Sequence, residues 1–188
     1  AQADPGHPLL VWVHLFEPHE PYEPAPGYRR GNEPEQRYDG EVAAADDAAG
    51  QLIELFRSKR PGGTVIVTAD HGEEFGDHGG HHHGTTLFDE QVRVPLLWSS
   101  PGQVASRRIA SPAQLVDIAP TLLSALGIPR DPRMRGSDLS ALLRGAPENP
   151  RLRAFASIEE LRMLSDGQHK LVCETAEGLC RLYDLRAD

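Results

Sequence analysis

The chain has 188 residues, of which 39% are hydrophobic and 25% are charged, so it is long enough to bury one packed core. Its formal net charge of −9 argues against nucleic acid as a partner, because a phosphate backbone is bound by a basic surface. No apolar run approaches the roughly 20 residues of a transmembrane helix, so we expect no transmembrane segment.

The first half of the chain is predicted to contain a strand, a helix and a second strand. The apolar run at residues 9–16 is typical of a buried strand. Apolar side chains recur at three- and four-residue intervals over residues 38–59, which indicates a helix that ends at residues 60–63. The β-branched residues at 64–68 predict another strand. A helix between two strands makes a βαβ unit, so we expect these strands to be parallel with a right-handed crossover.

A proline-rich stretch joins the first predicted strand to the helix. In Glu17-Pro18-His19-Glu20-Pro21-Tyr22 the prolines hold the backbone extended and rigid. Residues 23–37 are rich in proline and glycine, so we interpret them as an irregular loop on the substrate side. Taken alone, His19 fits either a surface loop with an incidental histidine or a binding role.

Asp70 and His71 come directly after the strand predicted at residues 64–68. The carboxyl ends of strands are where α/β sheets usually hold their ligands. A carboxylate beside an imidazole suits a divalent cation, and Gly72 lets the backbone turn away from it. The alternative is a helix N-cap beside a surface histidine. Four more histidines follow within a dozen residues, which favours a metal site. They are His78, His81, His82 and His83.

The second half of the chain is predicted to add one strand and two helices. Residues 94–99 are typical of a strand, and residues 111–126 of a helix with Ser111 as its cap. Pro120 should divide that helix near Asp117, and Asp117 and Thr121 look like capping residues. The buried face of this helix is expected to carry Leu115, Ile118, Leu122 and Leu126. A short helix is expected to end at Leu143.

The last portion of the chain is predicted to form short strands. They cover residues 153–158, 161–165, 169–175 and 179–185, with turns at 166–167 and 177–178. Cys173 and Cys180 flank the second turn, and either a cross-strand disulfide or two buried free thiols fits this position.

The order of these motifs resembles the sulfatases of the alkaline phosphatase superfamily. The matching segments are residues 16–24, 68–73, 83–95 and 117–123, together with Leu182-Tyr183-Asp184-Leu185 near the end. The resemblance implies an α/β fold: a partial alkaline phosphatase-like α/β/α sandwich with a small C-terminal antiparallel sheet. Residues 1–150 would be the C-terminal part of the catalytic domain, and residues 151–188 a small β subdomain.

The resemblance also implies roles for four residues. Asp70 and His71 would bind a divalent metal ion, with Ca²⁺ expected first and Mn²⁺, Mg²⁺ or Zn²⁺ as alternatives. His19 and His83 would be both substrate-binding and catalytic, gripping the sulfate group and assisting the leaving group. The other histidines of the loop match less securely, and we interpret them as loop residues or as supports behind the site.

The nucleophile of the family has no match in this chain. The family carries it as a Cys or Ser, converted to formylglycine, in a C/S-x-P/A-x-R motif, and an aspartate pair completes the metal site. Cys173 and Cys180 lack the Pro and Arg of that motif, and residues 99–103 have Gln where Arg is needed. We therefore expect the N-terminal part of the same enzyme to be missing and this chain to be inactive alone.

The expected function is metal-dependent hydrolysis of sulfate esters, and two alternatives remain open. A phosphoesterase or phosphonate monoester hydrolase is one, with a phosphate ester as substrate, because Asp-His in place of Asp-Asn is also common among phosphoryl-processing relatives. A non-catalytic binding domain that kept the sulfatase scaffold is the other. The cellular location stays open.

Overall fold

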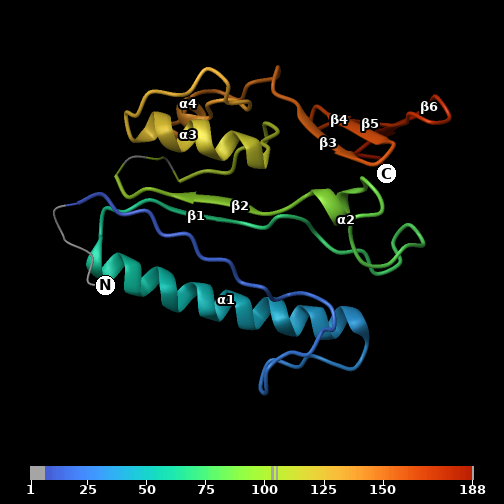
Figure 1. Ribbon diagram of the computed structural model, residues 1–188, viewed down its shortest axis with the longest axis horizontal. Helices are drawn as coiled ribbons and strands as arrows, with labels where there is room; N and C mark the ends of the chain where they lie inside the picture. Colours follow the sequence, from blue (N-terminus) through green and yellow to red (C-terminus); the bar gives the residue numbers. More distant parts are fainter. Residues whose placement is uncertain (1–6, 103, 105, 188) are drawn as a thin grey trace. The chain divides into compact units, whose positions relative to one another are not determined.

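The computed structural model describes residues 7–102, 104 and 106–187 (Figure 1). The chain forms two compact units, Ala1–Arg60 and Pro61–Asp188. The domain boundary predicted after residue 150 stays a prediction. None of the helices in the described ranges is both long and apolar enough to cross a membrane.

The first unit is built on one long helix, α1 (Pro34–Lys59). It confirms the helix predicted over residues 38–59 and begins one turn earlier. Pro34 stands in the first turn, where its fixed φ suits a helix and its missing N–H costs nothing. Gln36 accepts a hydrogen bond from the backbone N–H of Glu33 at 3.4 Å, which closes the N-terminus. The helix ends at Lys59, and its C-cap Arg60 is not helical because the following Pro61 disfavours a helical conformation in the residue before it.

The strand predicted at residues 9–16 is wrong. This segment has no regular secondary structure, and the side chains of Leu10 and Trp12 are 80% and 86% exposed. A strand needs a neighbour to pair its backbone groups, and the described part of the first unit offers no second strand. The predicted parallel βαβ unit is therefore wrong as well. The apolar composition of residues 9–16 is typical of a strand, but the described part of the first unit contains no strand with which this segment could pair.

The second unit begins with two short antiparallel strands, β1 (Val65–Thr68) and β2 (Leu96–Ser99). Both were predicted, and β2 starts two residues later than expected. Pro95 just before β2 has no N–H for a strand ladder, and its carbonyl accepts a hydrogen bond from the Thr68 hydroxyl at 2.8 Å. This bond holds the two strands together at the end where Asp70 and His71 follow.

The helix predicted at residues 111–126 is shorter and divided. It consists of a 3₁₀ turn, η1 (Leu115–Asp117), and α3 (Ile118–Ala125), so the predicted break near Asp117 is confirmed. The predicted cap at Ser111 is wrong, because its hydroxyl and N–H both donate to the Glu148 carboxylate. That contact leaves Ser111 outside the helix.

A buried polar pair replaces the apolar face predicted for this helix. Leu115 and Leu126 are exposed, whereas Asp117 and Thr121 are each 1% exposed. The Asp117 carboxylate accepts N–H bonds from Gln114 at 2.9 Å and Ser137 at 2.6 Å, and Thr121 accepts one from Leu139 at 2.9 Å. These bonds tie α3 to the segment leading into α4 (Ser140–Leu143). Asp117 is the N-cap residue of α3, but its side chain makes no capping hydrogen bond to that helix, and Thr121 lies inside it. The predicted capping role is therefore wrong, and both residues instead connect α3 to its neighbouring segments.

The chain ends in a four-stranded antiparallel sheet in the order β3-β4-β5-β6 (Figure 1). The strands are β3 (Ala154–Ile158), β4 (Leu161–Ser165), β5 (His169–Glu174) and β6 (Leu179–Asp184), within one residue of the prediction at every end. Cys173 and Cys180 face each other in the register of β5 and β6 and form a disulfide, which decides the alternative left open by the sequence.

Candidate functional site

Asp70 and His71 lie side by side directly after β1. The Asp70 carboxylate accepts the backbone N–H of His71 at 3.0 Å, and its Oδ2 lies 3.8 Å from His71 Nε2. His71 Nδ1 is 3.0 Å from the carbonyl of Gly72, so Nδ1 carries the proton and Nε2 keeps its lone pair. Both side chains are open to solvent, at 73% and 39% exposure. The pair thus presents one oxygen and one nitrogen together.

These two atoms fit a divalent cation. Ligand bonds of about 2.0–2.6 Å to carboxylate oxygen or imidazole nitrogen are compatible with two donor atoms 3.8 Å apart. The free lone pair on Nε2 is the ligand form of histidine. Two ligand atoms are too few to bind Ca²⁺ tightly, because this ion normally takes six to eight oxygen ligands.

Gly72 lets another segment approach this pair closely. Its N–H donates to the carbonyl of Gln91 at 2.8 Å, in the short helix α2 (Asp89–Val92). A Cβ at residue 72 would stand 2.0 Å from the carbonyl oxygen of Glu90, so no larger residue fits without moving α2. The sequence-based reason for this glycine was a sharp turn, whereas the structure adds a close approach.

His83 is brought to His71 by a small bridge across the histidine-rich loop. The backbones of Glu74 and His82 exchange two hydrogen bonds, of 3.0 and 2.9 Å, which places the neighbours Glu73 and His83 across from each other. The imidazole rings of His71 and His83 then stack, with centroids 3.8 Å apart and planes 19° from parallel. Three of the four predicted site residues, Asp70, His71 and His83, therefore meet in the second unit.

Glu73 is a member of this group that the sequence reasoning missed. Its side chain is 3% exposed, and its carboxylate oxygens lie 3.1 and 3.2 Å from His83 Nδ1. A carboxylate can only accept here, so Nδ1 donates and Nε2 is the nitrogen left to act elsewhere. The signal in the sequence was the position of Glu73 two residues after His71, but only the loop's closure pairs it with His83.

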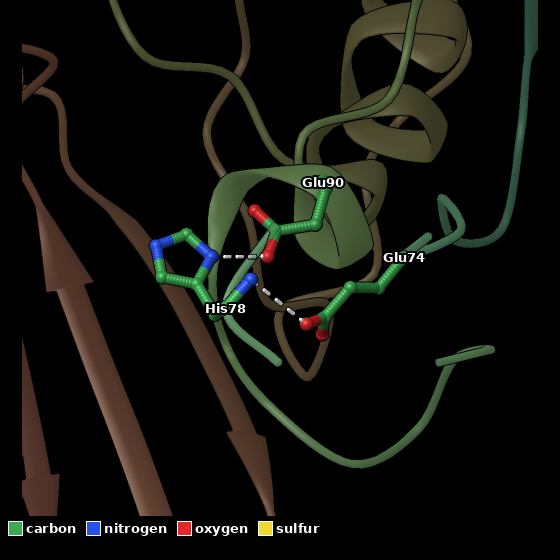
Figure 2. Close-up of side chains that lie close together, drawn as sticks. All are labelled: Glu74, His78 and Glu90. Atoms are coloured by element: carbon green, nitrogen blue, oxygen red, sulfur yellow. Dashed lines mark hydrogen bonds and ion pairs between the residues drawn. The ribbon is translucent and has the colours of Figure 1, made fainter. Parts of the chain in front are cut away.

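A second cluster closes the loop behind the site: Glu74, His78 and Glu90 (Figure 2). Each can offer one ligand atom, and these atoms lie within 4.8 Å of one another. However, the fully buried Glu74 carboxylate already accepts N–H bonds from His78, Gly80 and Gln91 at 2.8–3.1 Å. His78 Nδ1 is 2.6 Å from Glu90. We interpret the cluster as a clamp on the loop.

Electrostatics agree with a clamp. Burial acts to raise the pKa of Glu74, but hydrogen bonds from the Gln91 amide and from the backbone of Gly80 and His78 outweigh it, so its pKa lies below the usual range. The carboxylate is thus charged and fully engaged. A Cβ at residue 80 would stand 2.9 Å from it, which explains a glycine at this position.

The helix α2 fastens this loop to the C-terminal sheet. The ring of Phe88 stacks on His78 at 3.8 Å and meets Tyr183 of β6 edge-on at 5.9 Å. Lys170 of β5, 3% exposed, donates to Asp89 at 2.7 Å. Asp89 and Glu90 therefore fix this segment through protein contacts.

His19 belongs to the first unit and is held by α1. Its backbone N–H donates to Glu41 Oε2 at 3.2 Å, and the N–H of Glu23 donates to the other oxygen of the same carboxylate. The ring stacks on Phe16 at 4.8 Å, and its Nδ1 lies 2.8 Å from the carbonyl of Glu20. Glu41, 4% exposed, is a second residue that sequence reasoning missed, because it reads as one more acidic residue on a helix.

Comparison with known proteins identifies both sulfatases and a phosphoglycerate mutase as relatives. The family model "Sulfatase" matches residues 1–128. Arylsulfatase K of Mus musculus is 39% identical over 85 residues, covering 45% of this chain and 15% of that protein. The 2,3-bisphosphoglycerate-independent phosphoglycerate mutase of Desulforudis audaxviator (strain MP104C) is 35% identical over 99 residues, covering 52% and 18%.

A solved structure extends the likeness to most of the chain. The phosphonate monoester hydrolase of Agrobacterium radiobacter superimposes with a TM-score of 0.70 and 28% identity, covering 82% of this chain and 35% of that one. The chain therefore spans less than a fifth of the two curated relatives and about a third of the solved one. The alkaline phosphatase-like α/β fold with its small antiparallel sheet is confirmed.

Proposed function

The chain belongs to the sulfatase family of the alkaline phosphatase superfamily, and on that basis we propose that it carries part of the active site of a metal-dependent sulfatase. The observation that supports this most directly is the stacking of His83 on His71 beside the Asp70 carboxylate. This contact brings the candidate metal ligands, Asp70 and His71, next to the candidate general acid, His83.

Asp70 and His71 would hold the divalent ion, with Ca²⁺ as the first expectation and Mn²⁺, Mg²⁺ or Zn²⁺ as alternatives. When bound, the ion supplies positive charge against the charge that develops on the sulfate oxygens. Asp70 Oδ2 and His71 Nε2 are the donor atoms, and the His71 Nδ1 contact with Gly72 keeps the ring in the ligating tautomer. The remaining ligands must come from other residues.

His83 would bind the sulfate group and protonate the leaving oxygen through Nε2. The buried Glu73 carboxylate accepts a hydrogen bond from Nδ1–H and stabilises the doubly protonated ring, which can then donate a proton from Nε2. By resemblance to the family, His19 would be a further sulfate-binding residue. Its backbone is fixed by Glu41 and its ring by Phe16, so it is oriented before substrate arrives.

Turnover would further need a nucleophile, for which this sequence has no C/S-x-P/A-x-R motif. We propose that the active enzyme supplies it, as formylglycine, from residues outside these 188. The formylglycine hydrate would attack sulfur while the alcohol oxygen leaves and takes a proton from His83. By itself the chain would be inactive.

A second candidate is hydrolysis of phosphate or phosphonate esters by the same residues. The likeness to the Agrobacterium radiobacter phosphonate monoester hydrolase, with 28% identity over 82% of this chain, supports it as a candidate. Asp-His at residues 70–71 is compatible with either chemistry. Sulfate and phosphate groups are both tetrahedral oxyanions, so His19 and His83 alone do not choose between them.

The test is the coding sequence that adjoins this chain. A C/S-x-P/A-x-R motif upstream supports the sulfatase, whereas a lone Thr or Ser at the nucleophile position supports the phosphoryl alternative. Absence of both would reject hydrolysis in favour of a binding domain on the same scaffold. Assay of the extended protein on an aryl sulfate and an aryl phosphonate should agree with the motif.

A further inference from the structure

The first unit contains a cavity that the proposed chemistry does not use. Its volume is about 230 Å³, and it is lined by Glu23, Pro24, Arg29 and Arg37. It is smaller than the roughly 300–1,000 Å³ of pockets for drug-sized ligands, so it suits one small chemical group. Two guanidinium groups at a single small cavity point to an oxyanion, which the planar arginine fork binds with two parallel hydrogen bonds.

The loop that forms the cavity is held against α1 at several points. Gly40 of α1 is buried, and a Cβ there would stand 2.6 Å from the carbonyl of Tyr28 and 2.9 Å from Pro24. The Tyr28 hydroxyl donates to Asp47 at 2.6 Å. Gly31 packs still more closely on the Gln36 side chain, where a Cβ would stand 1.8 Å from Oε1. The walls are therefore built before any ligand arrives, which lowers the entropic cost of binding.

The two arginines are available to a ligand. Arg29 is oriented by its own loop, as Nε donates to the carbonyl of Gly31 at 3.2 Å and Nη2 to Asn32 at 2.9 Å, which leaves Nη1 unused. Arg37 is half-buried in the first turn of α1, and its guanidinium has no hydrogen bond or ion pair within the described residues. A half-buried cation without a partner carries an electrostatic cost that an anion would relieve.

Glu23 adds a second requirement. Over the same described ranges it forms no ion pair with either arginine, so its carboxylate remains an acceptor at the cavity wall. Its negative charge would weaken the binding of a bare anion to the two arginines, whereas hydroxyl groups beside an anion could donate hydrogen bonds to it. An acidic sugar has this combination of groups.

Glu41 links the cavity to His19. One oxygen of its carboxylate accepts the N–H of His19 and the other that of Glu23, so the candidate sulfate-binding histidine and the cavity wall share one buried anchor. We propose that the cavity is a specificity subsite for a second anionic group, a sulfate or carboxylate, on a hydroxyl-bearing sugar substrate. This rests on the proposed function only in calling the ligand a substrate.

The test is titration of the ¹⁵N-labelled chain with inorganic sulfate and with glucuronate, followed by amide shifts in residues 23–37. Saturable shifts are expected for both probes. Arg37→Gln should weaken binding about tenfold or more, because it removes a charge-assisted hydrogen bond to the anion. Arg30→Gln is the matched control: Arg30 is a neighbouring exposed arginine outside the cavity, and its loss should change affinity less than twofold.

A third probe tests the role of Glu23. Glucuronate should bind more tightly than acetate to the wild-type chain, and Glu23→Gln should reduce that preference. Absence of saturable shifts, equal weakening by Arg37→Gln and Arg30→Gln, or equal affinity for glucuronate and acetate would overturn the proposal. The titration needs neither metal nor turnover, so its failure leaves the roles of Asp70 and His83 untouched, and failure of the sulfatase proposal leaves this result standing.

Discussion

The imidazole rings of His71 and His83 stack 3.8 Å apart, and this contact joins the end of β1 to the far side of the histidine-rich loop. The two histidines are twelve positions apart in the sequence. The Glu74–His82 bridge and the Glu73 carboxylate hold His83 in this position. The proposed division of labour between the two histidines can be tested residue by residue.

The first prediction is that the chain alone hydrolyses no sulfate ester. It has no match to the nucleophile motif, and general acid catalysis alone contributes only about 10²–10⁴-fold. The measurement is release of phenol from an aryl sulfate by chain purified in the presence and absence of Ca²⁺. Multiple turnovers that survive a second purification and vanish in His83→Ala would contradict it.

The second prediction is weak metal binding. Asp70 and His71 provide two ligand atoms, far fewer than the six to eight that Ca²⁺ takes. Calorimetry with Ca²⁺, Mn²⁺ or Mg²⁺ should therefore give an affinity weaker than micromolar, and Asp70→Ala should abolish it. Submicromolar binding that persists in Asp70→Ala would move the metal elsewhere, with Glu74, His78 and Glu90 as the first group to examine.

The third prediction separates metal from substrate residues in the protein extended to include a nucleophile. Asp70→Ala should lower metal content and activity together. His83→Ala should keep the metal and lose activity by about 10²–10⁴-fold, the share of a general acid. His82→Ala is the control, because its side chain is exposed and its bridge to Glu74 uses backbone atoms. Loss of turnover in His82→Ala but not in His83→Ala would shift the assignment by one residue.

The fourth prediction concerns Glu73. In the same extended protein, Glu73→Gln keeps the side-chain shape but removes the charge that holds His83 Nδ1, so activity should fall by about 10–100-fold. The decrease should be in kcat rather than KM, with metal content and unfolding midpoint near wild type. Glu73→Ala, which lacks any acceptor, should be the more damaged. Equal activity in all three proteins would make the contact incidental.

The fifth prediction is a pH effect on stability at Glu148. Hydrogen bonds from the Ser111 hydroxyl and from the N–H groups of Ala110 and Ser111, with Arg107 nearby, lower its pKa to about 2. A folded-state pKa below the ordinary value of 4.5 stabilises the fold above pH 4.5, and this contribution is lost as the pH falls towards 2. Its size is reduced by solvent, because the Glu148 side chain is 41% exposed.

Urea unfolding of the wild type and Glu148→Gln measures this effect. The difference in unfolding free energy should be largest near pH 6 and shrink between about pH 4.5 and 2. Glu177→Gln, in the exposed turn between β5 and β6, is the control and should give a small difference at every pH. A Glu148→Gln difference that is constant from pH 6 to 2 would mean that ionisation of Glu148 contributes nothing.

Local patterns were sufficient for much of the fold. α1, the strands β1 to β6 and the break at Asp117 follow from side-chain periodicity, turn residues and one proline, which act over a few neighbouring residues. The segment at residues 9–16 is the counterexample: its composition is that of a strand, but strand formation depends on a pairing partner that no local pattern supplies.

Motifs contiguous in the chain were sufficient to identify the family, most of the helices and strands, and the pair at Asp70 and His71. The partners of the site residues became visible only in the folded chain. Glu73 reaches His83, Lys170 reaches Asp89, and Glu41 anchors the His19 loop, each across 10 to 81 residues of sequence. A buried carboxylate or ammonium is recognisable only when its partner is in place, since the partner is what makes its burial tolerable.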